Sequence, residues 1–254
     1  MTGKSCLWPV VAMAVSLFFA GHLQAQQAGG QQARSGKASA PIDLTGYWVA
    51  VIIQDWRWRM VTPAKGDYAG VPINAEAKKV ADTWDPAKDE AAGAPCKSYG
   101  APGLMRGPTR LHITWQDENT LKVETDYGTQ TRLFHFGNWK GSAGPGTLQG
   151  DSIAEWETPR AGRGEVPPPF GDLKAVTNHF SGGYLRKNGV PYGTNAVLTE
   201  YWDVFKEPNG DQRIMISTRV ADPQYLSTPW LTVLHFKKEA SGAKWDPTPC
   251  SASW

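Results

Sequence analysis

The sequence lacks the residue patterns on which several common chemistries depend. It contains no Gly-x-Ser-x-Gly turn, no Gly-x-x-x-x-Gly-Lys-Ser/Thr phosphate loop, no dinucleotide-binding glycine fingerprint and no His-Glu-x-x-His pair. These absences exclude the usual serine hydrolases, P-loop nucleotide hydrolases, Rossmann dehydrogenases and zinc proteases. We therefore expect no cofactor.

The sequence also lacks an excess of charge of one sign. Its 254 residues include 26 Lys and Arg against 24 Asp and Glu, which gives a formal net charge of +2. The acids and bases are mixed along the chain, so no electrostatic surface for nucleic acid or for anionic lipid is expected. We expect neither a nucleic-acid partner nor stable membrane insertion, and the sequence gives no oligomeric state.

Long hydrophobic runs are absent except for residues 7–20. This run follows Lys4, precedes the small residue Ala25 and is shorter than the roughly 20 residues of a membrane-spanning helix, as in a signal peptide. We predict a signal peptide over residues 1–25, a flexible leader over 26–40 and a single β-rich domain over 41–254. The protein is then periplasmic or secreted.

Cysteine is scarce, with three residues in the chain. Cys6 lies in the predicted signal peptide, which leaves Cys96 and Cys250 as an even pair in an oxidising compartment. A disulfide between these two is the simpler interpretation, and two free thiols are the alternative.

From Gly46 onward, short runs rich in Val, Ile, Thr and aromatic residues alternate with Gly, Pro, Asn and Asp, a pattern typical of strands and turns. One helix is expected over residues 74–84, where Asn74 can cap the first turn and Pro86 stops the last. Expected strands are 47–58, 110–115, 120–126, 130–136, 152–157, 173–179, 196–205, 213–220 and 230–237. The pattern predicts an all-β fold, either a closed barrel or a strongly curved antiparallel sheet around a cavity, with one inserted helix.

Two resemblances support this fold class. Gly46-Tyr47-Trp48 resembles the Gly-x-Trp start of lipocalin-type (calycin) barrels, which implies that Trp48 closes the barrel floor. Residues 43–250 resemble an uncharacterised family of exported, β-rich bacterial proteins. That resemblance lies in Asp55-Trp56 with Arg59, Gly66-Asp67-Tyr68, residues 186–191, Thr199-Glu200, and Asp222-Pro223 with Tyr225-Leu226. It implies a single β-rich domain and no particular chemistry.

Glu200 is the sharpest catalytic candidate. Strict alternation in its strand places it on an apolar face with Leu198 and Trp202. If that face lines a cavity, burial would fit the carboxyl for general acid–base catalysis. The alternatives are a core ion pair with Arg186 or Arg219, or a face turned to solvent.

Further candidates lie at the ends of expected strands. His179 ends strand 173–179 at the expected mouth of a cavity, where it would be the acid–base partner of Glu200 or a satisfied rim residue. Asp55 continues an apolar strand and is expected to share one face with Arg57 and Arg59, as a ligand anchor or as a structural ion pair. The expected catalytic set is His179, Glu200, Asp55, Tyr184 and Tyr192.

Tryptophan is abundant, with 12 residues. Most of these are expected in the core, but several lie beside polar candidates, as in an aromatic-lined pocket with a few polar groups. The expected ligand-binding set is Trp56, Trp58, Arg59, Arg186, Trp202, Trp230, His135 and His235. The histidines lie on different strands without short spacings, so no metal ligands are assigned.

Three functions remain open from the sequence. The first is binding of a small apolar or aromatic molecule in the barrel cavity. The second is a cofactor-free lyase, isomerase or hydrolase that uses His179 and Glu200, and the third is a surface-interaction module with an exposed apolar patch. Binding is favoured, because no complete catalytic constellation is visible.

Overall fold

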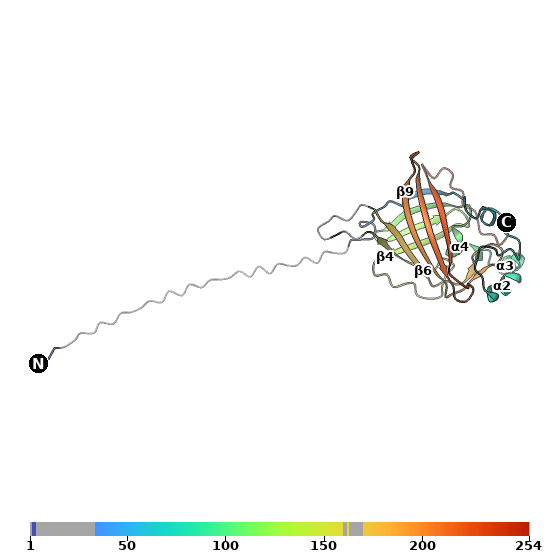
Figure 1. Cartoon of the computed structure of the whole chain (residues 1–254), viewed down its shortest axis with the longest axis horizontal. Coiled ribbons are helices and arrows are strands. Elements are labelled where there is room, and N and C mark those ends of the chain that lie inside the picture. Colours follow the sequence, from blue (N-terminus) through green and yellow to red (C-terminus); the bar gives the residue numbers. More distant parts are fainter. Residues whose placement is uncertain (1, 4–33, 160–161, 163–169, 254) are drawn as a thin grey trace. The chain divides into compact units, whose positions relative to one another are not determined.

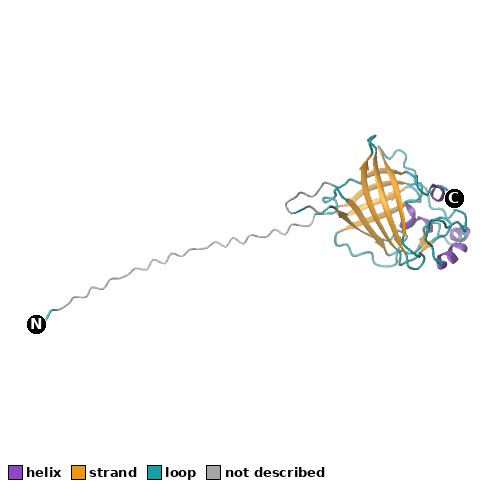
Figure 2. Ribbon diagram, viewed as in Figure 1, coloured by secondary structure: helices purple, strands orange, loops and turns teal. Residues whose placement is uncertain are grey.

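The computed structural model describes residues 2–3, 34–159, 162 and 170–253. Nine strands close into a barrel in the order β1-β11-β10-β9-β6-β5-β4-β3-β2 (Figures 1 and 2). The barrel strands are β1 (Gly46–Ala50), β2 (Arg110–Asp117), β3 (Thr120–Thr125), β4 (Gln130–Phe136), β5 (Asp151–Glu157), β6 (Asp172–Asn178), β9 (Val197–Lys206), β10 (Gln212–Ala221) and β11 (Trp230–Glu239). The predicted all-β barrel is confirmed, whereas the predicted signal peptide lies, apart from residues 2–3, outside the described residues.

Strand direction alternates around the barrel except at one pair. β4 and β5 run parallel, with Phe134 opposite Ser152, and every other neighbouring pair is antiparallel. Nine strands cannot alternate all the way around a closed ring, so one pair has to be parallel. Residues 137–150 must therefore return along the barrel to connect β4 to β5.

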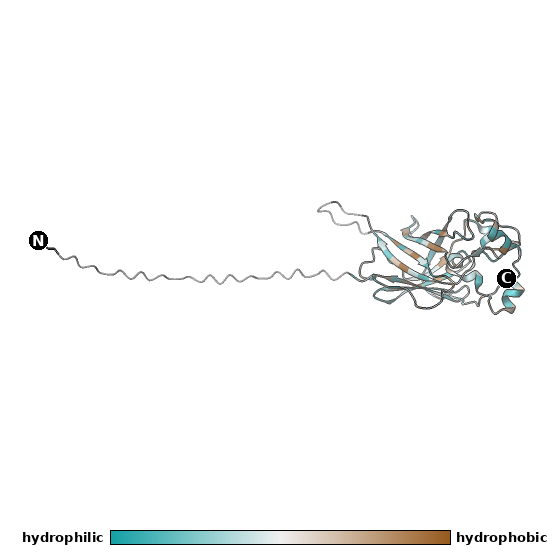
Figure 3. Ribbon diagram, turned by 90° about the horizontal axis from the view of Figure 1, so that it is seen from below, coloured by the Kyte–Doolittle hydropathy of each residue, from teal (hydrophilic) through white to brown (hydrophobic). Residues whose placement is uncertain are grey.

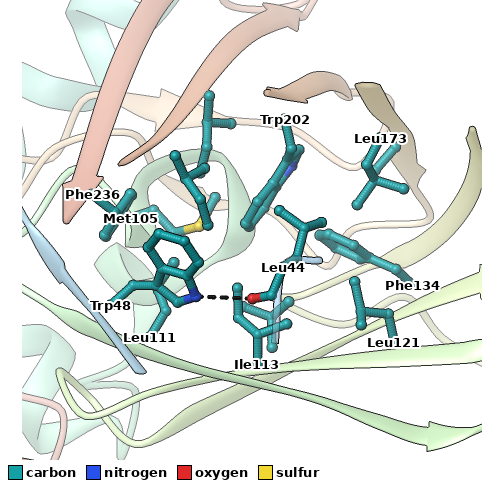
Figure 4. Close-up of a cluster of buried hydrophobic side chains, with 14 of the residues drawn as sticks. Leu44, Trp48, Met105, Leu111, Ile113, Leu121, Phe134, Leu173, Trp202 and Phe236 are labelled. Atoms are coloured by element: carbon teal, nitrogen blue, oxygen red, sulfur yellow. Dashed lines mark hydrogen bonds between the residues drawn. The ribbon is translucent and has the colours of Figure 1, made fainter. Parts of the chain in front are cut away.

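The barrel interior is filled by its own side chains. Burial follows the period of two that a strand imposes, and apolar and polar stretches alternate along the strands in Figure 3. Trp48 is fully buried, and its Nε1 donates to Leu44 O at 2.8 Å (Figure 4). Phe134 meets Trp202 edge to face, with ring centroids 5.4 Å apart. The interior is a packed core.

A cap covers one end of the barrel (Figure 2). It contains α1 (Trp56–Arg59), α2 (Ala75–Asp82), α3 (Pro86–Ala91), the 3-10 turn η1 (Lys97–Tyr99), α4 (Ala101–Leu104) and the two-stranded sheet of β7 (Gly183–Tyr184) and β8 (Pro191–Tyr192). Apolar side chains of the cap, among them Leu185 and Tyr192, form a second core with Leu198, Val220 and Trp230 at the barrel's strand ends. Cap and barrel are thus held by apolar packing.

The predicted helix is confirmed as α2, and Asn74 Oδ1 accepts from Ala77 N at 2.9 Å as an N-cap. The expectation of one helix was incomplete, because three shorter helices accompany it in the described residues. The strand predicted over 47–58 was wrong beyond Ala50. Since β2 begins at Arg110, opposite Val49, the chain after Ala50 loses one of its two strand neighbours and turns into α1.

The last part of the expected leader makes defined contacts. Gly36 N donates to Asn119 Oδ1 at 2.8 Å, and Gly36 O accepts from Trp156 Nε1 at 2.6 Å. A Cβ at Gly36 would come within 2.4 Å of the Phe136 ring. Residues 34–40 therefore lie against the barrel, at the end opposite the cap.

The predicted disulfide is confirmed between Cys96 and Cys250, with Cα atoms 5.1 Å apart. It joins the cap to the C-terminal tail, and a bond of this kind is typical of compartments outside the reducing cytoplasm. Among the described residues, no helix has the length and apolarity that crossing a membrane requires.

Candidate functional site

Three buried arginines surround one small pocket in the cap. Arg59 of α1 is 4% exposed, Arg106 between α4 and β2 is 6% exposed, and Arg186 between β7 and β8 is 5% exposed. All three line a cavity of about 40 Å³, together with Trp58 and Tyr127. We call this cavity the arginine pocket.

The positive charge of the arginine pocket exceeds the negative charge beside it. Among the described residues, the one carboxylate that forms an ion pair with these arginines is Asp55, whose Oδ2 accepts from Arg106 Nη2 at 2.9 Å. Burial and the neighbouring Arg106 lower the pKa of Arg59 and of Arg186 to about 10. Burial also lowers the pKa of Arg106, against the opposing effect of Asp55. Because a pKa of about 10 lies well above neutrality, Arg59 and Arg186 stay charged at pH 7.

Two of the guanidinium groups keep buried donors without a partner among the described atoms. Arg59 donates from Nε to Arg106 O at 2.8 Å and from Nη1 to Gln54 O at 3.4 Å, which leaves Nη2 unbound. Arg186 donates from Nη1 to Ala69 O at 2.8 Å, which leaves Nε unbound. An unmet buried donor costs about 1–3 kcal/mol, and more when it is charged. Both arginines line the arginine pocket, and guanidinium forks match carboxylate and phosphate groups best.

Aromatic rings hold the arginines in place. The Arg106 guanidinium lies 4.6 Å from the Trp230 ring centroid, and that of Arg186 lies 5.3 Å from the Trp58 ring and 5.8 Å from Trp230. Trp230 Nε1 donates to Gly70 O at 2.8 Å, which fixes the indole itself. Such cation–π contacts orient the cations without using their N–H donors.

The size of the cavity limits what it can hold. A water molecule needs about 10–15 Å³ of cavity volume. The arginine pocket, at about 40 Å³, therefore accommodates roughly three waters or one carboxylate or phosphate group. A larger ligand has to extend beyond the arginine pocket.

Two local backbone features position the arginines. Asp55 precedes α1 with φ 52, a left-handed conformation that Asp tolerates better than most residues, and its carbonyl accepts from Trp58 N and Arg59 N. Gly189 has φ 81 in the turn after Arg186, and a Cβ there would come within 2.2 Å of Trp84. The Asp and Gly identities at these turns thus set the directions of Arg59 and Arg186.

No family model, curated protein or solved structure matches this chain. The assignment of the site therefore depends on its geometry.

The structure brings together part of the set predicted from the sequence. Trp58, Arg59 and Arg186 line the arginine pocket, and Asp55 and Trp230 contact its arginines. The prediction that Asp55, Arg57 and Arg59 share a strand face was wrong, because this segment is a left-handed turn and a helical turn. Arg106 was missed, since it lies in a segment without periodicity, and only its position between Gly and Pro-rich turns marks it in the sequence.

Glu200 lies in the barrel core and forms an ion pair with Arg132. Arg132 donates from Nη1 to Oε1 at 2.9 Å and from Nη2 to Oε2 at 2.5 Å, and both side chains are fully buried. Thr177 Oγ1 accepts a further bond from Arg132 Nη2 at 3.3 Å. The core ion pair considered from the sequence is present, but its partner is neither Arg186 nor Arg219.

His179 lies just past the end of β6 with φ 59, where both ring nitrogens are engaged. Nδ1 lies 2.9 Å from Asp151 Oδ2 and Nε2 lies 3.0 Å from Gly144 O. The hydrogen bond to Asp151 raises the pKa of His179. Among the described residues, no hydrogen bond or ion pair joins His179 to Glu200.

The remaining predicted residues lie outside the lining of the arginine pocket. Tyr192 is buried, with its hydroxyl donating to Leu148 O at 3.4 Å, and Tyr184 lies half-buried near Asp89, so burial raises the pKa of both phenols. Others are Trp202 in the core, the 63%-exposed Trp56, His135 stacked on Trp139, and the half-buried His235. In the described part of the chain, no three His, Cys, Asp or Glu side chains gather as a metal site would require.

Proposed function

We propose that this protein is an exported binding protein for a small molecule with an apolar or aromatic body and one anionic group, which the arginine pocket holds. The observation that carries the proposal is the meeting of three buried arginines around one small cavity, with Asp55 as the carboxylate that pairs with them among the described residues. A carboxylate or phosphate in the cavity would accept hydrogen bonds from the guanidinium groups and balance the excess charge.

The residues that line the arginine pocket support the proposal that the ligand has an apolar or aromatic body. Trp58 is half-buried and Tyr127 lies on the opposite segment between β3 and β4, so ring surfaces border the position of the anionic group. Such a combination of aromatic walls and a few convergent polar groups is typical of small-molecule sites. Export is supported by the predicted signal peptide and by the disulfide.

The enzyme hypothesis has weaker support. Both carboxylate oxygens of Glu200 already accept from Arg132, and both ring nitrogens of His179 are engaged by Asp151 and Gly144. Neither group lines the arginine pocket or the cavity of about 400 Å³ beside the C-terminal tail. Binding without turnover is the function that these contacts favour.

The test is calorimetric titration of the full chain with benzoate, phenyl phosphate and uncharged benzyl alcohol. We expect the two anions to bind and benzyl alcohol to bind at least tenfold more weakly. Arg186→Gln is expected to weaken benzoate binding by about 10- to 100-fold, because a hydrogen bond to a charged group contributes roughly 1.5–3 kcal/mol. Its thermal midpoint is expected to stay or to rise, because one of three like charges is removed.

The matched control is Arg219→Gln, which removes the same charge from an exposed side chain on β10 and is expected to change affinity less than twofold. If neither anion binds in a saturable way, the proposal fails. The surface-interaction hypothesis would then replace it, supported by the exposed side chains of Ile53, Trp56, Met60 and Val61.

A further inference from the structure

We infer that the ligand is elongated, with its anionic end in the arginine pocket and its apolar body in a second cavity beneath the C-terminal tail. This inference rests on the proposed function. The second cavity, which we call the tail cavity, has a volume of about 400 Å³ and is lined by Tyr99, Pro108, Tyr127, Lys187, Thr248 and Pro249, among others.

The arginine pocket and the tail cavity are adjacent. Tyr127 and Lys187 line both of them. Lys187 Nζ donates to Tyr99 OH at 2.7 Å and lies 5.0 Å from the Tyr127 ring centroid, while the Tyr99 and Tyr127 rings are 4.8 Å apart. Tyr127 and Lys187 therefore form the shared wall of the two cavities, and a ligand that occupies both cavities contacts these two side chains.

The two cavities differ in size and chemistry in a complementary way. About 40 Å³ in the arginine pocket accommodates a head group, whereas about 400 Å³ in the tail cavity lies in the range of sites for whole small molecules. Aromatic and proline surfaces line the tail cavity, and its charged lining residues are two basic ones, Arg110 and Lys187, and two acidic ones, Asp126 and Asp246, whose formal charges cancel. The tail cavity thus fits an uncharged, ring-containing body.

The outer wall of the tail cavity is the C-terminal tail, which is fastened at several points. Thr248 N donates to Asp126 O at 2.8 Å, and Ser251 N donates to Tyr99 OH at 3.2 Å. The disulfide from Cys250 to Cys96 ties the same stretch to the residue that precedes η1. The tail cavity consequently depends on the oxidised state of the protein, while the arginine pocket is built from residues outside the tail.

The experiment compares benzoate with biphenyl-4-carboxylate on the oxidised full chain. We expect biphenyl-4-carboxylate to bind at least tenfold more tightly, because its second ring reaches the tail cavity. In Cys96→Ser/Cys250→Ser, this advantage is expected to fall to within threefold while the affinity for benzoate stays unchanged.

A second variant keeps the test decisive if the double cysteine variant does not fold. Ser251→Phe fills the tail cavity with the disulfide intact and is expected to abolish the biphenyl advantage, whereas Ser241→Phe, on an exposed loop outside the tail cavity, is expected to preserve it. Equal affinities for the two probes in the unaltered protein would overturn the inference and leave the proposed function standing, provided that Arg186→Gln still weakens benzoate. A biphenyl advantage that survives both variants would also overturn it, as would failure of biphenyl-4-carboxylate alone to bind. Failure of both probes and of phenyl phosphate to bind would overturn both proposals.

Discussion

At the scale of single residues, the barrel core contains an ion pair that is surrounded by apolar side chains. Arg132 on β4 and Glu200 on β9 meet across the barrel interior, since β6 and β5 separate their strands in the sheet. Taking two charges out of water is costly, and their mutual attraction offsets that cost only while both are present. The pair therefore makes each of its members hard to replace alone.

Glu200→Gln is expected to lower the free energy of unfolding by about 3–5 kcal/mol, because it leaves the Arg132 charge buried and unpaired. The measurement is urea denaturation followed by tryptophan fluorescence. The double variant Arg132→Met/Glu200→Leu is expected to recover most of the loss. A double variant as unstable as the single one would contradict this explanation.

His179 is expected to make stability depend on pH in one direction. Its pKa is raised above the ordinary value of 6.5 by Asp151, so its stabilising effect is complete below that value and is lost as pH rises through the raised pKa. The difference in unfolding free energy between the unaltered protein and His179→Gln is therefore expected to be larger at pH 5.5 than at pH 9. Denaturant titrations of both proteins at pH 5.5 and pH 9 measure this difference in unfolding free energy.

His235 supplies a control of opposite sign. Burial and the nearby Arg59 lower the pKa of His235, so its neutral form is favoured in the fold and its contribution is lost as pH falls. A His235→Gln variant with the same pH trend as His179→Gln would show that the trend has another source.

At the scale of elements, α1 connects the barrel to the arginine pocket. It is a single turn whose preceding residue, Asp55, combines a left-handed backbone with the ion pair to Arg106. An element this short is not stable by itself. Its position depends on the packing and the ion pairs of its own side chains.

Asp55→Asn is expected to tighten benzoate binding by about two- to tenfold, because it frees Arg106 while Asn keeps the left-handed turn. It is also expected to lower stability by no more than about 1 kcal/mol, because the Asp55 carboxylate is 43% exposed. Calorimetry and thermal unfolding measure the two effects. Asp211→Asn, in the β9–β10 turn at the other end of the barrel, is the control, and an equal gain in affinity there would indicate a general charge effect.

Elements with their own periodic pattern could be predicted from the sequence, and elements that depend on tertiary contacts could not. The strands at 120–125 and 130–136 alternate clearly, and α2 has both an amphipathic face and a cap. By contrast, α4 is the sequence Ala-Pro-Gly-Leu, which has poor helix propensity and forms where all four residues are buried. Its helical turn depends on tertiary packing, which the local sequence pattern does not predict.

At the scale of the whole molecule, the closed barrel was predictable in class and the candidate site only in part. The sequence indicated residues 55–59, where polar residues continue an apolar strand, and Arg186 as candidate ligand-binding positions. Their proximity to Arg106 depends on how the cap folds over the barrel end. The sequence contains no pattern that predicts contact between segments this far apart. Ligand binding inside the barrel stays a prediction, and inward-facing side chains such as Trp202 belong to its apolar core.

The position of β1 between β2 and β11 has a consequence for biosynthesis. β1 ends at Ala50, but its second neighbour ends at Glu239, so the ring cannot close until almost the entire chain has been made. At about 5–20 residues per second, the ribosome needs on the order of 10–40 s for that interval. Throughout this time the growing polypeptide has open sheet edges that can pair with other chains. The first barrel strand to be translated is thus among the last to gain both neighbours.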